Sequence, residues 1–345
     1  MPLTGQDIQS LKPVIVLAGP TAIGKSRVAI EMAKAMGTDV LTADSRQVFR
    51  GMDIGTDKPT IAERQGVPHQ LIDLVAPDQH FNVGDYRQHA VQEIGRLHDQ
   101  GKIPLIAGGT GLYIRAVLRG LWIGPTADWT FRNRLTQEAK EKGETFLYQE
   151  LKKVDPELAQ RVHPRDHVKI QRGLEVYHLL GTPLSQSHQC HGFQERPYPS
   201  LFVGLTMERE SLYKRIEARV ELEIAKGLLE ETQELLDRGF SRTLRSMTSL
   251  GYRQFSGYLA GEYSYDEAVS LLKRDTRHFA KRQMTWFRKE PSIHWLSVEP
   301  EESPFQVADR VLFLCQEFLS RLKGSKPASP LQSTLGPVNP RSEAI

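Results

Sequence analysis

The sequence predicts an α/β fold, in which a parallel sheet with helices on its faces is interrupted by a helical insertion. Three observations support this fold class. Short apolar runs alternate with helical patterns over the first 120 residues, a glycine-rich loop joins the first run to the first helix, and the pattern is almost wholly helical from 128 to 180. Strand–helix–strand order at these lengths predicts parallel pairing.

The core elements follow from local spacing. The first strand is a β-branched run that ends at a glycine, and the helix after it places Val28, Met32 and Met36 at helical spacing before Gly37 stops it. Asn82 is available to cap the helix that starts at Asp85. The predicted strands are residues 14–17, 40–43, 103–107 and 201–205, and the predicted helices are 26–36, 85–100 and about 210–236.

The chain is long enough for about two folding units. Loops rich in Gly, Pro and Ser at 124–127 and 182–200 bracket the helical block. We therefore predict an α/β core from 1–123 and 198–322 and a helical insertion domain at 124–197. Residues 323–345 hold four Pro, four Ser and two Gly but no aromatic residue, which predicts a disordered tail.

Composition excludes several classes of protein. The chain is 39% hydrophobic and 25% charged, as soluble globular proteins are, and its apolar runs fall far short of the roughly 20 residues of a membrane span. The polar, mixed residues 1–12 do not resemble a secretion leader. Two cysteines, Cys190 and Cys315, exclude a disulfide scaffold and a four-cysteine zinc site. We expect a cytoplasmic protein without membrane contact.

A phosphate-binding motif lies between the first strand and the first helix. It fits G-x-x-x-x-G-K-[ST] and consists of Gly19, Pro20, Thr21, Ala22, Ile23, Gly24, Lys25 and Ser26. The glycines let backbone N–H groups point inward, the helix N-terminus favours an anion, Lys25 supplies a charge and the Ser26 hydroxyl can bind Mg²⁺. The motif predicts a diphosphate or triphosphate ligand and does not say which one.

The acidic residue that a nucleotide hydrolase needs is harder to find. The predicted strand 103–107 runs into Gly108-Gly109-Thr110-Gly111 without a carboxylate, and Leu71-Ile72-Asp73 is a weaker candidate for an acidic strand end. Asp44 follows the second strand, so Asp44, Thr110 and Lys25 are expected at the same rim of the sheet, where ligands bind in open α/β folds. A carboxylate beside a phosphate loop serves as a base, a metal ligand or a helix cap, and the spacing leaves these open.

Positive charge gathers in two places. Residues 162–172 contain Lys169, Arg172 and three other basic side chains against one acid, Asp166. Further on, Arg274, Arg277, Lys281 and Arg288 share one helix face, with Arg282 and aromatic residues beside them and no acid between Asp275 and Glu290. Such stripes favour a polyanionic partner with salt-dependent binding.

Ordered blocks of sequence resemble one family, the bacterial tRNA dimethylallyltransferases, also called tRNA isopentenyltransferases or the IPP transferase family. The resemblance spans about Pro13 to Trp295. The matching blocks are the phosphate loop, 44–59 (DSRQVFRGMDIGTDKP), 68–73 (PHQLID), 108–113 (GGTGLY), 166–175, 250–253 (LGYR) and 280–288 (AKRQMTWFR).

The resemblance implies a P-loop NTPase-like, kinase-like fold whose phosphate loop holds dimethylallyl diphosphate, with Mg²⁺ at Ser26. The prenyl group would move to N6 of the adenosine 3′ of the anticodon, at position 37 of tRNA. Asp44 would be the general base, Thr110 would align the amine and the leaving oxygen, and Arg219 would join the diphosphate pocket. Ile23 stands where the family has a small residue, which implies a reshaped prenyl pocket.

The resemblance also implies how the anticodon stem-loop of tRNA is bound. The flipped base would be read by Ser45, Arg46 and Gln47 beside Asp44 and Thr110. The anticodon arm would be bound by Arg132, Val168, Lys169, Ile170, Gln171, Arg172, Thr248, Ser249, Leu250, Gly251, Tyr252 and Arg253, joined by the basic face with Arg277, Lys281 and Arg282. A monomer is the expected state.

Three other functions remain open at this point. One is an isopentenyltransferase acting on free adenine nucleotides, whose members lack much of the helical insertion. The second is a small-molecule P-loop kinase. The third is a nucleic-acid-binding protein that merely keeps the phosphate loop.

Overall fold

Three strand ends meet in one row at the carboxyl edge of a parallel sheet. In this computed structural model Ala18 pairs with Gly108, and Gly108 with Ala43, so Gly19, Gly109 and Asp44 leave the sheet side by side. Gly108 lets the strands approach, because a Cβ there would clash with the Ala43 carbonyl. The phosphate loop and Asp44 thus start from the same edge of the sheet, with the strand that ends at Gly108 between them.

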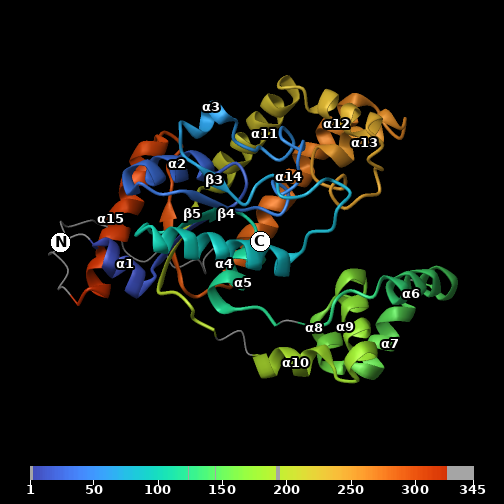
Figure 1. Cartoon of the computed structure of the whole chain (residues 1–345). Helices are drawn as coiled ribbons and strands as arrows, with labels where there is room; N and C mark the ends of the chain where they lie inside the picture. Colours follow the sequence, from blue (N-terminus) through green and yellow to red (C-terminus); the bar gives the residue numbers. More distant parts are fainter. Residues whose placement is uncertain (1–2, 123, 144, 192–194, 325–345) are drawn as a thin grey trace. The chain divides into compact units, whose positions relative to one another are not determined.

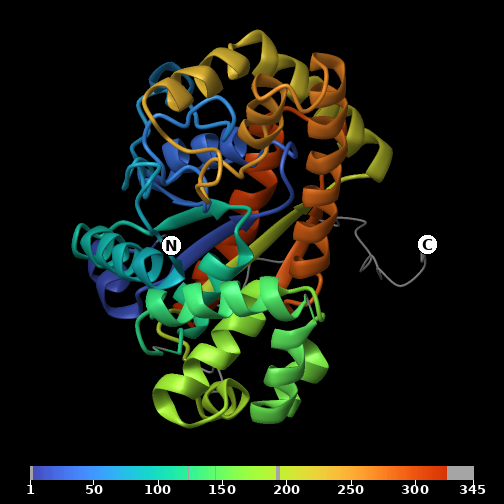
Figure 2. The same cartoon turned by 90° about the vertical axis from the view of Figure 1, so that its right-hand side faces the viewer.

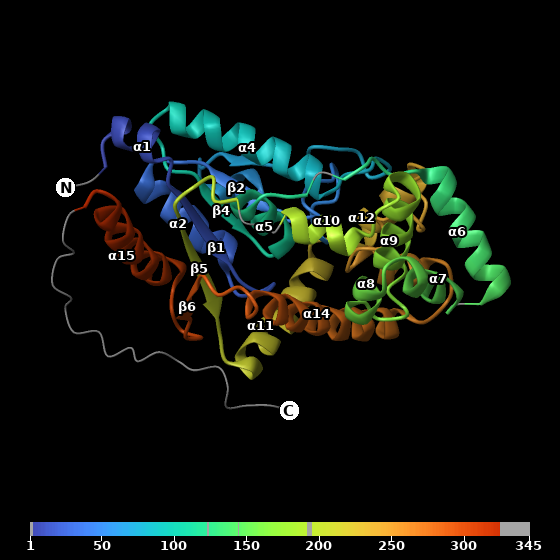
Figure 3. The ribbon, with the colours of Figure 1, turned by 90° about the horizontal axis from the view of Figure 1, so that it is seen from below.

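The sheet has the order β3-β2-β4-β1-β5-β6, and its strand pairs are all parallel (Figure 1 and Figure 3). The structure describes residues 3–122, 124–143, 145–191 and 195–324. The strands are β1 (Val14–Ala18), β2 (Val40–Ala43), β3 (His69–Gln70), β4 (Leu105–Gly108), β5 (Ser200–Thr206) and β6 (Ile293–Ser297). All five side chains of β1 are buried, as expected for a central strand covered on both faces.

The described chain divides into two compact units. Within the described ranges, the first comprises residues 3–79, 92–109 and 199–324, and the second residues 80–91 and 110–198. Helix α4 (Val83–Asp99) contributes residues to both. The other helices of the first unit are α1 (Gly5–Leu11), α2 (Lys25–Met36), α3 (Ile61–Arg64), α11 (Arg209–Ala225), α12 (Leu228–Asp237), α13 (Tyr252–Leu259), α14 (Tyr265–Phe287) and α15 (Pro304–Leu322).

The core of the first unit lies between the sheet and three helices. Ile15 and Leu17 of β1 pack with side chains of α2, α11 and α15 in one hydrophobic cluster. Helices α2 and α15 contact each other, and Figure 3 shows them side by side. This core supports the helix that begins at the phosphate loop.

The second unit contains α5 (Gly111–Arg119), α6 (Trp129–Lys142), α7 (Phe146–Val154), α8 (Pro156–Arg161), α9 (His167–Leu180) and α10 (Leu184–His191). The predicted insertion 124–197 falls within this unit, and its helices α6 to α9 form a bundle (Figure 2). Leu147, Leu151 and Ile170 are fully buried in its core. Asp155 and Asp166 cap α8 and α9, and Pro156 starts α8, so the helical block is divided into separate helices at these residues.

Three predicted elements differ from the structure. The single helix expected over 210–236 is two helices, because Gly227 adopts φ 99° between α11 and α12. The strand expected over 103–107 is shifted to Leu105–Gly108. The alternative acidic strand end at Asp73 is wrong, since Leu71 and Asp73 have φ values of 67° and 54° and the chain turns there.

Two findings concern the ends of the molecule and the membrane. Helix α15 ends at Leu322 and Lys323 pairs with Asp7 at 2.7 Å, whereas the remainder of the predicted tail, from 325 on, lies outside the described residues. Within the described ranges, no helix has the length and apolarity that a bilayer span requires.

Candidate active site

The phosphate loop curls because two residues take the left-handed conformation. Ala22 has φ 64° and Gly24 has φ 98°. Gly24 is the N-cap of α2 and offers no side chain to the first-turn N–H groups, and that turn contains no acid. The helix N-terminus therefore presents amide donors and partial positive charge to an anion.

Lys25 lies inside this loop and donates from Nζ to the Pro20 carbonyl oxygen at 2.7 Å. Desolvation, helped by the nearby Arg219, lowers the pKa of its amine to about 8, against the opposing pull of Asp44 and Asp57. The amine remains charged at neutral pH but is held against weak acceptors. An incoming phosphate group would therefore restore a strong partner to it.

Arg219 of α11 reaches the same loop. Its Nη1 donates to the Thr21 hydroxyl at 2.6 Å, and the guanidinium pairs with Glu223 at 2.6 Å and with Asp57 at 3.3 Å. Burial disfavours the charge, but the Glu223 and Asp57 carboxylates raise the pKa of Arg219 above its usual value. The arginine predicted for the diphosphate pocket thus lies at the loop.

The side chain of Ile23 is buried, whereas that of Ser26 is exposed. The Ile23 side chain is 1% exposed and packs into the core of the first unit, so only its backbone can face a ligand in the loop. The reshaping of the prenyl pocket that the resemblance implies for Ile23 stays a prediction. Ser26 is exposed in the first turn of α2.

The donor set suits a magnesium ion that is shared with substrate. Mg²⁺ takes oxygen ligands, keeps several waters and is usually held by one or two protein groups plus substrate phosphates. The exposed Ser26 hydroxyl and the half-buried Asp44 carboxylate are ligands of that kind. Within the described part of the chain, no cluster of three or more His, Cys, Asp or Glu forms a metal site by itself. These residues therefore fit Mg²⁺ only together with a phosphorylated ligand.

Asp44 is anchored through one carboxylate oxygen. Its Oδ1 accepts from the Arg46 N–H at 2.8 Å and from the Gln47 N–H at 3.4 Å. Among the described residues, none donates to Oδ2. Of the three roles that the sequence left open, Asp44 caps the turn with one oxygen, and its other oxygen is available, so the roles of base and metal ligand stay predictions.

The neighbours of Asp44 are largely engaged in holding loops. Arg46 donates to the Arg245 carbonyl at 2.7 Å, and the buried Gln47 donates from Nε2 to the Thr56 carbonyl at 3.0 Å. Ser45 is half-buried beside them. The structure thus assigns Gln47 a role in holding the segment 52–58, which includes Asp57, in addition to any contact with a base.

Thr110 is the N-cap of α5 and belongs to the second unit. Its carbonyl oxygen accepts from the N–H groups of Tyr113 at 3.0 Å and Ile114 at 3.3 Å. Thr110 follows Gly109 directly, and β4 ends at Gly108, so Thr110 is two residues beyond the carboxyl end of that strand, as the sequence predicts.

The basic stretch on α9 divides into exposed and structural residues. Val168 is 79% exposed, and Lys169 is exposed beside Asp166, to which it donates at 2.6 Å. Ile170 is fully buried, and the contact with tRNA that the resemblance implies for it stays a prediction. Gln171 is bonded to Thr136 at 3.0 Å.

Arg132 and Arg172 also hold the second unit together. Both pair with Glu175, which is completely buried, Arg132 through two hydrogen bonds of 2.8 Å and Arg172 at 2.5 Å. Despite desolvation, the two arginines keep the pKa of Glu175 below its ordinary value. Their charges are thus already largely compensated within the protein.

The stretch 248–253 is mostly interior. Ser249, Gly251 and Tyr252 are buried, Leu250 is half-buried, and only Thr248 and Arg253 are exposed. The Tyr252 hydroxyl donates to Glu231 at 2.5 Å, and Glu231 accepts the N–H of Ile54 at 3.0 Å. Tyr252 therefore supports the loop around Ile54, and the contacts with tRNA that the resemblance implies for Ser249 and Tyr252 stay predictions.

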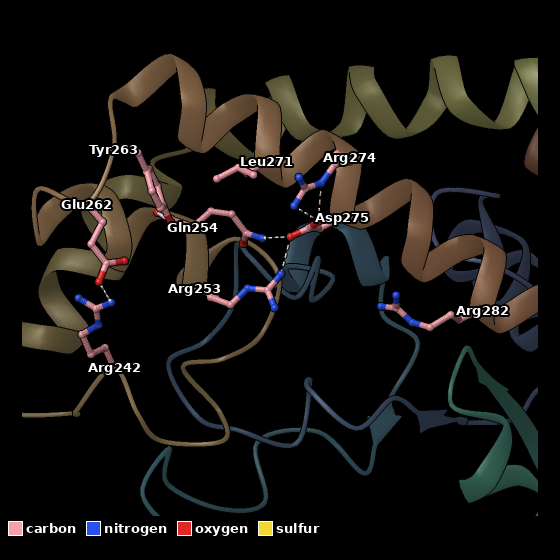
Figure 4. Close-up of a pocket in the computed structure, with 9 residues that line it drawn as sticks. All are labelled: Arg242, Arg253, Gln254, Glu262, Tyr263, Leu271, Arg274, Asp275 and Arg282. Carbon is pink, nitrogen blue, oxygen red and sulfur yellow. Dashed lines mark hydrogen bonds and ion pairs between the residues drawn. The ribbon is translucent and has the colours of Figure 1, made fainter. Parts of the chain in front are cut away.

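A pocket of about 620 Å³ opens along α13 and α14 (Figure 4). Arg253, Gln254 and Arg274 converge on Asp275, and Arg242 pairs with Glu262. Arg282 has no acidic partner among the described residues, and its guanidinium lies 5.9 Å from the Phe279 ring. The pocket is lined by Arg242, Arg253, Gln254, Glu262, Tyr263, Leu271, Arg274, Asp275 and Arg282.

The basic face of α14 is less uniform than its sequence indicates. Arg277 pairs with Glu217 of α11 at 2.7 Å, so its charge is compensated from another helix. Lys281 and Arg282 line a smaller hollow with His278 and Thr285, and the described residues include no acid paired with either. These two cations are the strongest anion-binding candidates on the helix.

Sequence reasoning missed three residues at the loop. Asp57 and Glu223 pair with Arg219, and Gln283 of α14 contacts both Thr21 and Gly109. Asp57 and Gln283 lie in blocks that carry the family resemblance, which was the available signal. Glu223 lies four residues after Arg219, at the spacing of a helical ion pair.

The six-stranded parallel sheet and the glycine-rich loop before α2 define a class of protein, an α/β protein with a P-loop NTPase-like fold. A family model described as IPP transferase matches residues 47–290. The chain belongs to the IPP transferase family, a family of prenyltransferase enzymes, which confirms the resemblance and the fold class predicted from sequence.

Relatives support this membership over most of the chain. A tRNA dimethylallyltransferase 2 of Geotalea uraniireducens is 47% identical, covering 87% of this chain and 96% of the relative. The full-length tRNA isopentenylpyrophosphate transferase of Bacillus halodurans superposes with a TM-score of 0.69 at 35% identity, covering 91% and 98%. A eukaryotic dimethylallyltransferase described as acting on tRNA shares the fold, with a TM-score of 0.75 at 24% identity over 90% and 80%.

Proposed function

We propose that the protein transfers a dimethylallyl group from dimethylallyl diphosphate to N6 of the adenosine 3′ of the anticodon, position 37 of tRNA, and releases diphosphate. The names of its relatives support a tRNA substrate and a prenyl donor. The phosphate loop, with its compensating cations, supports a diphosphate leaving group.

The observation that carries this proposal is the row Gly19, Gly109 and Asp44 at the sheet edge. The strand between the phosphate loop and Asp44 ends in glycines rather than in a carboxylate. Asp44 lies close enough to Lys25 to oppose the lowering of the Lys25 pKa by desolvation. Two strand spacings, roughly 9–10 Å, separate the strand ends. A base on one side and a leaving-group cradle on the other suit substitution at carbon better than phosphoryl transfer.

The chemistry follows from these positions. Lys25, the loop N–H groups and Arg219 stabilise negative charge on the departing diphosphate as the carbon–oxygen bond breaks. The carbon–nitrogen bond forms at N6, and the N6 proton passes to the available Oδ2 of Asp44. Thr110 aligns the amine. Mg²⁺ bound with Ser26 and the diphosphate would add charge neutralisation.

The tRNA partner follows from the exposed cations. An anticodon loop offers an unpaired base, which costs only a few kcal/mol to extrude. Lys169, Arg253 and Lys281 are exposed and suit contacts with phosphates. The proposal includes that the protein is a monomer in the cytoplasm. Cys315 is buried, and burial raises the pKa of its thiol to about 12, which suits a reducing compartment.

One assay tests this function against its alternatives. Purified protein is incubated with labelled dimethylallyl diphosphate and Mg²⁺ in the presence of unmodified tRNA or AMP, and separately with ATP. Label on tRNA alone is the expected result. Label on AMP alone would indicate an adenylate isopentenyltransferase, and phosphate transfer from ATP would indicate a kinase. If the protein binds tRNA but transfers neither label nor phosphate, it is a nucleic-acid-binding protein. Each of these three results would overturn the proposal.

A further inference from the structure

A single glutamine bridges the phosphate loop and the end of the neighbouring strand. Gln283 of α14 accepts the Thr21 N–H at its Oε1 at 2.8 Å and donates from Nε2 to the Gly109 carbonyl at 3.0 Å. Gln283 is 7% exposed. Because both ends of the amide are used, its orientation is determined by its partners.

The close approach at Gly109 depends on the absence of a side chain. A Cβ at Gly109 would clash with Gln283 Nε2. Gly109 does not adopt a positive φ, so its backbone does not itself require glycine. The glycine is therefore explained by room for the Gln283 amide.

Thr21 is held from two helices. Gln283 binds its N–H, and Arg219 of α11 binds its hydroxyl at 2.6 Å. Gly109 immediately precedes Thr110. The Gln283 amide thus sets the separation between the loop that holds the leaving group and the residue before Thr110.

We infer that Gln283 is a positioning residue for prenyl transfer, which acts by fixing the phosphate loop and the β4 terminus relative to each other. The inference rests on the proposed function, since it assigns the loop to the diphosphate. A small misplacement of reacting groups costs on the order of 100-fold in rate, whereas ligand binding tolerates it better. Loss of the bridge should therefore lower kcat more than it raises KM.

The test compares Gln283→Met with Thr276→Val. Methionine keeps the length of the side chain and removes both hydrogen bonds. Thr276 is buried on the same helix, and its hydroxyl donates only to Leu272 of that helix at 2.8 Å, which makes it a matched control. We expect Gln283→Met to lower kcat roughly 10- to 100-fold, with KM for both substrates and Kd for inorganic diphosphate within about threefold. Thr276→Val should leave kcat unchanged.

Two further variants keep the inference testable if Gln283→Met does not fold. Gln283→Glu keeps the acceptor for Thr21 but sets a carboxylate oxygen against the Gly109 carbonyl, and Gly109→Ala displaces the amide. Each should lower kcat, and the double variant Gly109→Ala/Gln283→Met should be no slower than the worse single one, because both remove the same bridge. Additive losses, or a folded Gln283→Met with wild-type kcat, would overturn the inference.

A measurement independent of turnover separates this inference from the proposed function. Amide hydrogen exchange at Thr21 should accelerate in Gln283→Met and remain unchanged in Thr276→Val. If the wild-type protein transfers no prenyl group to tRNA, the proposed function fails. If it does and the Gln283 variants match it, only the positioning role fails.

Discussion

The guanidinium of Arg219 donates a hydrogen bond of 2.6 Å to the hydroxyl of Thr21, across 198 residues of sequence. The contact links α11 to the phosphate loop, and Glu223 and Asp57 hold the pKa of the guanidinium above its usual value. Arg219 therefore supplies a permanent positive charge at the loop, unlike Lys25.

Replacing Arg219 with Met should weaken diphosphate binding. A hydrogen bond to a charged group is worth about 1.5–3 kcal/mol, so KM for dimethylallyl diphosphate should rise roughly 10- to 100-fold. Steady-state kinetics and calorimetric titration with diphosphate measure the effect. Arg310→Met is the matched control, since Arg310 of α15 pairs with Glu302 at 2.6 Å and donates to the Ser297 carbonyl, and neither partner belongs to the loop. An unchanged KM would remove Arg219 from the pocket.

The variants Asp44→Asn and Asp44→Ala distinguish the role of Asp44 as a general base from its role in capping the turn. Asparagine retains the oxygen that accepts from Arg46, whereas alanine removes it. If Asp44 is the general base, both variants should lose roughly 10²- to 10⁴-fold in kcat, with tRNA affinity nearly unchanged. Single-turnover kinetics and filter binding give the two quantities. Near-normal turnover in Asp44→Asn would assign Asp44 a purely structural role.

Lys25 should make diphosphate binding depend on pH. Its amine has a pKa of about 8 in the free protein, and a bound anion raises that pKa, so binding takes up a proton above pH 8. Affinity attributable to this group should be level below pH 8 and fall by up to about tenfold per unit above it. Titration calorimetry in buffers of different ionisation enthalpy detects the uptake. Lys25→Arg stays charged and should show none; the same pH profile in that variant would contradict the assignment.

Lys169→Ala should reduce the salt dependence of tRNA binding. Lys169 is exposed, and its partner Asp166 competes only weakly at the surface. If Lys169 contacts one phosphate, the slope of log K against log salt should fall by about one unit, equally for all tRNAs. Lys153→Ala, exposed on α7 in a similar pair with Glu150, is the control. An unaltered slope would exclude Lys169 from the interface.

Arg172→Ala should act mainly on stability. It removes one partner of the buried Glu175, which retains Arg132, so we expect a loss of about 1–3 kcal/mol in the free energy of unfolding at pH 7. Because the pKa of Glu175 is lowered on folding, this stabilisation is present above its unfolded value of about 4.5 and is lost as pH falls below it. Urea melts at pH 7 and pH 4 should therefore show a smaller difference at the lower pH. A normal melt with a reduced salt slope would instead place Arg172 on tRNA.

Local pattern predicted much of the fold correctly. The strands predicted at 14–17 and 40–43 and the helix predicted at 26–36 match β1, β2 and α2 to within one residue, because short apolar runs and the glycines Gly24 and Gly37 act within a few residues. The phosphate loop was equally legible, because its motif is contiguous. The break at Gly227 was missed because a glycine within a helical pattern is often tolerated, and only packing decides whether the chain turns.

The sequence by itself determined four of the described strands, the phosphate loop and the family, since each is written in contiguous residues. Only the tertiary structure decided which polar groups face one another. Gln283 accepts a hydrogen bond from Thr21, which is 262 residues away in the sequence. Glu175 forms ion pairs with Arg132 and Arg172, and the sequence alone does not show that these two arginines are paired. The reason is physical: a helix face presents several side chains equally, and the packing of its neighbours selects which of them are buried and paired.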